Sequence, residues 1–269
     1  MAQSERHGIE RAKWDAHAHA TSASLDELEL IPEGTTLQSY ARDKLSLTGM
    51  AEFLGDLEGK RVLEYGCGLG ALTIVLARSG AEVTSFDLSE ASIDFARARA
   101  ERNGVADRIR FVVADGENLP FADGSFDLAV GKAILHHLDP AAGAAELARV
   151  LAPGGRAAFS EPLGMNPILV FVRNHVPYPG KHERGADRPL TANDLRLWGA
   201  PFADARMRPF HLLSMVERGL GFGHPLPFLR KADRWLLARF PRLRRLCRYA
   251  VLLFEAKGSA ETARAETSA

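Results

Sequence analysis

The sequence predicts an α/β fold built around a parallel sheet. From residue 61 onward, short apolar segments of strand length alternate with helical patterns, and this alternation with right-handed crossovers gives a parallel sheet. A glycine-rich turn separates the first strand from the first helix. The chain has 269 residues, of which 46% are hydrophobic, so it is long enough for one α/β domain with additions.

The glycine-rich turn indicates the kind of ligand. The first strand ends in Glu64, and Gly66, Gly68 and Gly70 follow at every second position. Glycines allow close approach of the backbone to a ligand and unusual backbone angles. A dinucleotide site has the spacing Gly-x-Gly-x-x-Gly, and a carboxylate beside the turn would repel a pyrophosphate. We therefore expect a cationic ligand, such as an amino-acid ammonium.

The strands that follow end in acidic residues. The strand at 82–87 ends in Asp87, about 20 residues past the turn, where a ribose diol is held in nucleotide-binding folds. The strand at 109–115 ends in Asp115. The series continues with Pro-Phe-Ala-Asp-Gly-Ser-Phe-Asp at 120–127, a fourth strand at 128–133, Leu-His-His-Leu at 135–138 and Arg-Val-Leu-Ala-Pro-Gly-Gly at 149–155.

In this order, over residues 60–162, the motifs resemble those of the class I S-adenosylmethionine-dependent methyltransferases. The resemblance implies S-adenosylmethionine as cofactor and a Rossmann-like seven-stranded sheet with six parallel strands and an antiparallel strand 7. It assigns the acidic residue and glycines of the turn to the amino-acid part of the cofactor, Asp87 to ribose and Asp115 to adenine. The predicted cofactor-binding residues are Glu64, Gly66, Gly68, Gly70, Asp87, Leu88, Asp115, Gly116 and Lys132.

The remaining elements follow from local patterns. Helices are expected at about 70–79, 89–103 and 140–151, and later strands at 155–162, 205–213 and 246–256. Residues 1–60 are expected to form an N-terminal helical cap, with a loop at 31–35. The methyltransferase domain is expected at 61–257, with insertions at about 163–190 and 214–245, and the polar residues 258–269 as a disordered tail. The cap and the insertions are expected to carry acceptor specificity, because ligands bind at the carboxyl edge of such a sheet.

Two groups are candidates for proton removal from the acceptor. His136 and His137 follow strand 4, and an imidazole has a pKa suited to general base catalysis near neutrality. Glu161 ends strand 5, and a carboxylate buried among apolar groups can also serve as a base. The alternatives are structural: the imidazoles cap a turn, or the acid accepts hydrogen bonds from backbone amides.

The segment after Glu161 is apolar and then basic, which suits an amphiphilic acceptor with an anionic head. This combination also resembles, over a short stretch, the bacterial prenyl diphosphate C-methyltransferases. That resemblance implies C-methylation of an allylic prenyl diphosphate, with Glu161 as base, Arg173 and His182 on the diphosphate, and possible Mg²⁺. Predicted substrate contacts are Arg173, His182, Tyr178, Trp198 and Tyr40.

Two other functions stay open. One is O-methylation of a phenolic or hydroxylated metabolite, with His136 or His137 as base. The other is a methyltransferase-fold protein that binds S-adenosylmethionine without transferring methyl groups, since fold alone does not fix function. In either methyltransferase interpretation, the acceptor is expected to be a small natural-product or isoprenoid molecule of secondary metabolism.

Composition limits the partners and the location. The net charge is +0, so a nucleic-acid partner is not expected. Two cysteines, no basic-then-apolar leader and no apolar run of about 20 residues predict a cytoplasmic protein. Residues 226–248 mix apolar and basic side chains, which predicts either a helix packed on the domain with a solvated basic face or a peripheral membrane contact.

Overall fold

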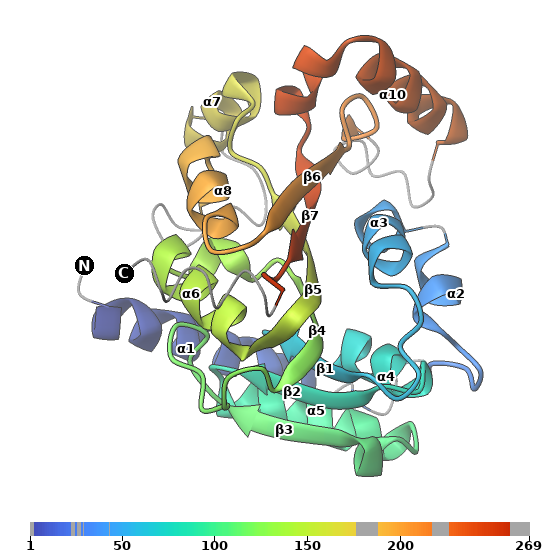
Figure 1. Ribbon diagram of the computed structural model, residues 1–269, viewed down its shortest axis with the longest axis vertical. Coiled ribbons are helices and arrows are strands. Elements are labelled where there is room, and N and C mark those ends of the chain that lie inside the picture. Colours follow the sequence, from blue (N-terminus) through green and yellow to red (C-terminus); the bar gives the residue numbers. More distant parts are fainter. Residues whose placement is uncertain are drawn as a thin grey trace.

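The computed structural model describes residues 3–22, 25, 28, 30–42, 44–175, 188–216 and 226–258 (Figure 1). Its helices are α1 (Gln3–Ser22), α2 (Leu37–Ala41), α3 (Leu45–Leu54), α4 (Ala71–Arg78), α5 (Glu90–Arg102), α6 (Pro140–Val150), α7 (Pro167–His175), α8 (Ala192–Gly199) and α10 (Pro227–Arg239). Its strands are β1 (Arg61–Tyr65), β2 (Glu82–Asp87), β3 (Ile109–Val113), β4 (Phe126–Lys132), β5 (Leu151–Pro162), β6 (Asp204–Phe210) and β7 (Tyr249–Glu255). Short 3₁₀ helices are η2 (Ala106–Arg108), η3 (Leu135–His137) and η4 (Pro241–Leu246).

The strands form a seven-stranded sheet in the order β3-β2-β1-β4-β5-β7-β6. Strands β1 to β5 pair in parallel, and β7 lies antiparallel between β5 and β6. This confirms the predicted sheet of six parallel strands and an antiparallel strand 7. The chain moves outward from β1 to β3 and then returns to β4 beside β1. Ligands bind at such a reversal, beyond the carboxyl ends of the strands.

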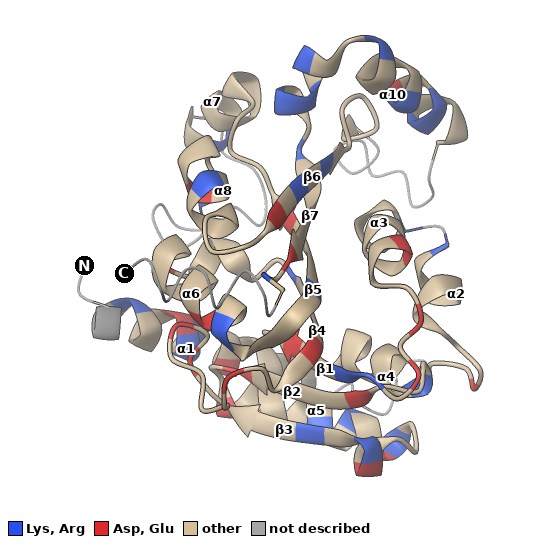
Figure 2. Ribbon diagram, viewed as in Figure 1, with Lys and Arg blue, Asp and Glu red and all other residues tan. Residues whose placement is uncertain are grey.

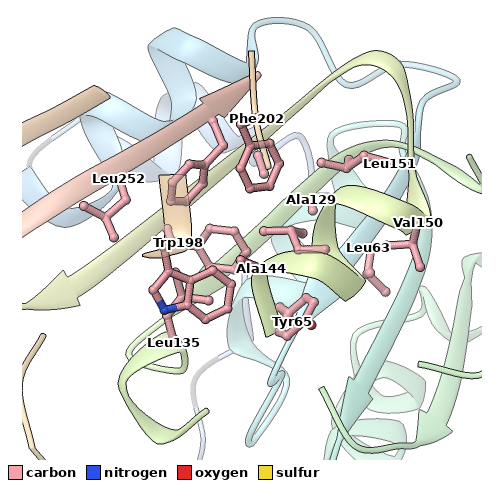
Figure 3. Close-up of a cluster of buried hydrophobic side chains, with 14 of the residues drawn as sticks. Leu63, Tyr65, Ala129, Leu135, Ala144, Val150, Leu151, Trp198, Phe202 and Leu252 are labelled. Atoms are coloured by element: carbon pink, nitrogen blue, oxygen red, sulfur yellow. The ribbon is translucent and has the colours of Figure 1, made fainter. Parts of the chain in front are cut away.

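Helices cover both faces of the sheet, which explains why its central strands are continuous apolar runs (Figure 1). One core cluster joins the sheet to α6 and α8, and Figure 3 shows Leu63, Val150, Trp198 and Leu252 within it. A second cluster lies on the opposite face, where α3 and α4 pack on the sheet. The central strands are therefore buried on both faces, because their alternating side chains enter one cluster or the other.

Two N-caps fix the starts of the helices that follow β2 and β4. Ser89 Oγ accepts a hydrogen bond from the amide of Ser92 at 3.0 Å and begins α5. Asp139 accepts hydrogen bonds from the amides of Ala141 and Ala142 and begins α6. These side chains satisfy amides that have no partner inside the helix. The turns between strand and helix are thereby held at the edge of the sheet where the site lies.

Several predicted strand limits differ from the structure. Strand β3 ends at Val113, before the predicted 115, and β4 spans Phe126–Lys132 in place of the predicted 128–133. Strand β6 ends at Phe210, before the predicted 213, because His211 takes a left-handed φ of 60°. Strand β7 begins at Tyr249, after the predicted start at 246, because η4 extends to Leu246. Strand β5 begins four residues early, at Leu151, which pairs with β4 across a register shift.

Candidate active site

A cavity of about 330 Å³ lies at the carboxyl ends of β1, β2 and β4, where the strand order reverses. Its wall combines the glycine-rich turn, the strand ends, η3 and the N-terminal helices α1, α2 and α3. The predicted residues that line it are Glu64, Gly66, Gly68, Asp87, Leu88, Asp115, Gly116, Lys132, His137 and Tyr40. Thus the fold brings most of the predicted cofactor set to one place, and adds groups from the cap.

The three glycines of the turn have different neighbours. All three have positive φ angles, between 49° and 74°. A Cβ on Gly66 would lie 2.6 Å from Ile134, and one on Gly70 would lie 2.8 Å from Ala96 of α5. A Cβ on Gly68 would meet nothing within 4 Å, although Gly68 lines the cavity. Gly68 therefore leaves space for a ligand, whereas Gly66 and Gly70 let parts of the chain pack closely.

Glu64 is a buried carboxylate on the cavity wall. Its Oε2 accepts hydrogen bonds from the hydroxyls of Thr73 and Ser85, the second at 2.8 Å. Burial raises the pKa of Glu64 to about 7, assisted by the charge of Asp87 and opposed by the two hydroxyls. A cation beside this carboxylate would favour its charged form, so the group suits the predicted ammonium.

Asp87, at the end of β2, holds the turn in place. Its Oδ2 accepts the amide of Gly68 at 2.9 Å, and its Oδ1 accepts the amide of Ser89 at 3.0 Å. Burial raises the pKa of Asp87, while these amides and the charge of His137 act in the opposite direction. The side chain therefore both lines the cavity and fixes the glycine that leaves space in it.

The acid after β3 lies under the N-terminal helix. Asp115 accepts the amide of Glu117 at 2.9 Å, and its other oxygen lies 3.3 Å from Nδ1 of His7. Gly116 is close-packed, because its carbonyl accepts the hydroxyl of Tyr65 and a Cβ there would lie 2.8 Å from the same ring. Arg6 pairs with Glu117. Helix α1 is thus attached to the wall predicted to bind adenine.

Two lysines, Lys44 and Lys132, also line the cavity. Lys132 ends β4, and burial lowers its pKa, with a further contribution from the positive charge of Lys44. Its side chain still has exposed surface, and that surface faces the cavity. Lys44 donates a hydrogen bond to the carbonyl of Tyr40 at 2.9 Å and lies 3.7 Å from the centre of its ring. An anionic ligand group near these lysines would relieve their repulsion.

Glu161 and His136 form a buried pair behind the cavity. Nδ1 of His136 lies 2.7 Å from Glu161 Oε2, and the carboxylate is 0% exposed. Its other oxygen accepts the amides of Ile134 and Leu135, at 2.8 and 3.0 Å. Neither side chain lines the cavity. Glu161 therefore fixes the turn that carries both histidines, which was the structural alternative for this acid.

His137 is the histidine on the cavity wall, and its ring lies 4.1 Å from that of His136. Its Nδ1 is 3.1 Å from Oε1 of Glu10, a residue of α1. Burial acts to raise the pKa of Glu10, but the hydrogen bond and charge of His137, with Lys13, outweigh it and lower that pKa. An ionised Glu10 can only accept a hydrogen bond, so it favours the tautomer of His137 that carries its proton on Nδ1 and its lone pair on Nε2. No hydrogen bond joins Nε2 to another described residue.

Other predicted contacts lie elsewhere. Trp198 is fully buried in the core and packs on Gly143. It is therefore a core residue and does not have the predicted contact with the acceptor. Gly70 does not line the cavity, and Arg173 lies on α7 away from it. Tyr178 and His182 lie outside the described residues. Within the described ranges, His, Cys, Asp and Glu do not gather into a group of three that could hold a metal ion.

The sequence predicted that the N-terminal cap contributes to the site, but it did not identify three of the cap residues that reach the cavity. His7, Glu10 and Lys44 line the cavity, but none stands in a motif. The available signal was an unusual density of charged residues and histidines in a segment expected to be helical. Such a segment gives no indication of which face meets the sheet, because charged residues occur all around it.

The cavity offers what the implied cofactor needs. Glu64 suits an ammonium group, Asp87 a ribose diol and Asp115 an adenine amino group, and aromatic and aliphatic side chains separate these acids. Gly68 leaves room for the ligand beside the turn. The residues present therefore fit S-adenosylmethionine.

Comparison with known proteins agrees with this fit. Residues 63–159 match the family model described as a methyltransferase domain. A demethylmenaquinone methyltransferase of Clavibacter sepedonicus is 36% identical over 142 residues, which cover 52% of this chain and 57% of the relative. A ubiquinone biosynthesis O-methyltransferase of Alkalilimnicola ehrlichii is 36% identical over 162 residues, 60% of this chain and 62% of the relative. The chain thus spans about three fifths of the length of these relatives.

A solved structure shares the fold. The geranyl diphosphate C-methyltransferase of Streptomyces coelicolor A3(2), in complex with Mg²⁺, geranyl diphosphate and S-adenosyl-L-homocysteine, matches with a TM-score of 0.54. The match covers 78% of each chain at 18% identity, so it concerns the fold alone. Residues 63–159 thus match a methyltransferase domain, and the sheet order and the glycine turn with its three acids agree with the resemblance of the sequence motifs to class I S-adenosylmethionine-dependent methyltransferases.

Proposed function

We propose that this chain transfers a methyl group from S-adenosylmethionine to a hydroxyl oxygen of a small, largely apolar acceptor, with His137 as general base. The observation that carries the proposal is the contact between Glu10 and Nδ1 of His137 on the cavity wall. The contact holds the imidazole in the tautomer whose Nε2 can accept a proton. Histidine is the side chain that most often serves as a general base near neutral pH.

The cofactor would lie along the glycine turn. Glu64 and the space beside Gly68 would hold its amino-acid part, Asp87 and Leu88 its ribose, and Asp115 with Gly116 its adenine. Bound S-adenosylmethionine supplies an electrophilic methyl group, which the acceptor oxygen takes as the carbon–sulfur bond breaks. The chain contributes alignment of the two molecules and removal of the hydroxyl proton by His137.

A second candidate is C-methylation of an allylic prenyl diphosphate, in which Mg²⁺ would bind the diphosphate. Lys44 and Lys132 favour it, because two cations on the cavity wall suit an anionic acceptor group. The predicted base Glu161 is less favourable, because its two oxygens already accept hydrogen bonds and it does not line the cavity. In this candidate Glu161 would act through His136.

An S-adenosylhomocysteine release assay separates the candidates. Phenolic and hydroxylated acceptors are tested beside geranyl, farnesyl and geranylgeranyl diphosphate, with and without Mg²⁺. The proposal expects turnover of a hydroxylated acceptor that falls about 10²- to 10⁴-fold in His137→Gln. Glu10→Gln should lower turnover less than loss of His137, because the ring remains. Its matched control is Glu33→Gln, since Glu33 is an exposed acid away from the cavity. Turnover of a diphosphate that needs Mg²⁺ and survives His137→Gln would establish the second candidate instead.

A further inference from the structure

Helix α10 and the segment after it form a surface that the proposed reaction does not use. This basic-aromatic surface consists of residues Phe228, Lys231, Arg234, Trp235, Arg239, Phe240, Arg242, Arg244 and Arg245, all of them exposed. None of them lines the cavity. Among the described helices, none has the length and apolarity needed to cross a bilayer.

The charge of this region is strongly one-sided. Residues 226–248 contain eight basic residues and one acidic residue, although the whole chain has a net charge of +0. Figure 2 shows basic segments along α10 and the coil that follows it. The one acid, Asp233, is buried, so the exposed charges of the described residues 226–248 are all positive.

Asp233 also fixes which side of α10 faces outward. Its carboxylate accepts the amides of Leu212, Leu213 and Ser214, at 2.7 to 3.2 Å, and the hydroxyl of Ser214 at 2.6 Å. These bonds attach one side of the helix to the chain that follows β6. The opposite side is left to the solvent.

The solvent side carries aromatic and basic residues in one stripe. Phe228, Lys231, Trp235 and Arg239 are separated by three or four positions, so they lie along one face of the helix. Phe228 is 66% exposed and Trp235 is 62% exposed. A solvated basic face does not require two large exposed rings, whereas an interfacial helix places rings in the acyl boundary and cations at the headgroups.

Helix α7 also exposes apolar side chains. Asn166, just before α7, donates a hydrogen bond to the carbonyl of Leu246 in η4 at 2.7 Å. Ile168 and Phe171 of α7 are 69% and 59% exposed. Helices α7 and α10 both lie toward the top of the view in Figure 1. Exposed rings and aliphatic groups therefore occur on α7 as well as on α10.

We propose that the basic-aromatic surface docks this protein on an anionic lipid bilayer. Positive charge complements anionic headgroups, and Phe228 and Trp235 add apolar area that enters the interface. A nucleic acid would pair its phosphates with the basic side chains, but Phe228 and Trp235 on the regular helix α10 would have no bases to stack on. The proposal is independent of the acceptor and of the methyl-transfer reaction.

The test is sedimentation of the full chain with vesicles. Vesicles of phosphatidylcholine alone are compared with vesicles containing 30% phosphatidylglycerol, at low and at high salt. We expect at least tenfold stronger binding to the anionic vesicles, and weakening as salt increases. The triple variant Arg242→Gln, Arg244→Gln, Arg245→Gln is expected to lose about 100-fold in affinity. The double variant Phe228→Ala, Trp235→Ala is expected to lose about tenfold or more.

Matched controls keep the outcome clear. The double variant Arg97→Gln, Arg108→Gln removes exposed arginines from other surfaces and should bind like the parent. Thermal melts check that each variant is folded. A blue shift of tryptophan emission with vesicles should disappear in Trp235→Phe, since Trp14 and Trp198 are not on this surface. Equal binding to both vesicle types, unchanged binding in the aromatic variant, or tighter binding to duplex DNA than to vesicles would each overturn the proposal.

Discussion

The carboxylate of Glu10 lies 3.1 Å from Nδ1 of His137, although 127 positions separate the two residues in the sequence. Both side chains are almost enclosed, with 8% and 9% of their surfaces exposed. The pair joins helix α1 to the turn after β4 and, at the same time, orients an imidazole on the cavity wall. The same contact therefore attaches the cap and orients the residue proposed as the base.

Removing either member of this pair should affect turnover more than cofactor binding. His137→Ala is expected to lower kcat by about 10²- to 10⁴-fold, because the proton acceptor is lost. Its affinity for S-adenosylhomocysteine, measured by calorimetry, should stay within about twofold of the parent. Added imidazole should restore part of the activity. Glu10→Gln should cost less, since the ring remains, and a tenfold loss of cofactor affinity in His137→Ala would contradict the assigned role.

Glu64 should make stability depend on pH. Its folded-state pKa of about 7 exceeds the ordinary value of 4.5, so the folded chain binds more protons than the unfolded chain between these limits. The free energy of unfolding should therefore decrease as pH rises from about 4.5 to 7, by at most roughly 3 kcal/mol from this group. Glu64→Gln should remove that part of the slope. Denaturant unfolding at pH 5 and 8, for parent and variant, measures the difference.

The same carboxylate should make cofactor binding tighten with pH. The ionised form of Glu64 attracts an ammonium group, so affinity for S-adenosylhomocysteine should rise as pH increases through about 7. Calorimetric titrations of parent and Glu64→Gln across this range test it. A parent affinity that is constant from pH 6 to 8 would show that Glu64 does not bind the cationic part.

Alanine at Gly68 and at Gly70 should act in different ways. Both positions have positive φ, so each substitution introduces strain of about 1–2 kcal/mol. At Gly70 the new methyl group would also lie 2.8 Å from Ala96, and overpacking adds about 1–3 kcal/mol. At Gly68, which lines the cavity, it would meet no atom within 4 Å. We expect the larger loss of stability in Gly70→Ala and the larger loss of cofactor affinity in Gly68→Ala.

Glu161 should behave as a positioning residue for the turn that carries the histidines. Glu161→Ala removes the acceptor for the amides of Ile134 and Leu135 and leaves them buried, which should lower the free energy of unfolding by about 2–5 kcal/mol. Glu161→Gln keeps one oxygen for these amides and should restore most of the stability. When Glu161→Gln is combined with His137→Gln, turnover should fall only slightly below that of His137→Gln alone. A full additive loss in the double variant would indicate that Glu161 removes the proton itself.

The parts of the site that were predictable are those specified by local sequence. Asp87 ends β2, and the glycine turn and Asp115 follow β1 and β3 within a few residues, so all three lie at the edge where the carboxyl ends of the parallel strands meet. Their positions thus follow from the order of the motifs. The sixth and seventh strands were located to within a few residues, and their ends shifted where His211 and η4 took irregular backbone conformations.

Other parts depended on contacts between distant segments. Trp198 was expected to contact the acceptor, but it packs beside Gly143 because α8 covers α6. Glu161 and His136 were considered as rival bases, and the structure makes them partners at 2.7 Å. Neither relationship has a signal in the local sequence, because both depend on which loops the sheet brings together.

By itself, the sequence determined the α/β class, the cofactor edge and the acids that line it, since strand periodicity, glycine spacing and motif order act over short distances along the chain. Only the tertiary structure decided that Glu10 and His7 of α1 reach the cavity, that Glu161 stays behind it, and that Trp235 faces the solvent. The physical reason is that an amphipathic or charged segment has several possible faces, and the choice among them is made by packing against elements that are distant in sequence.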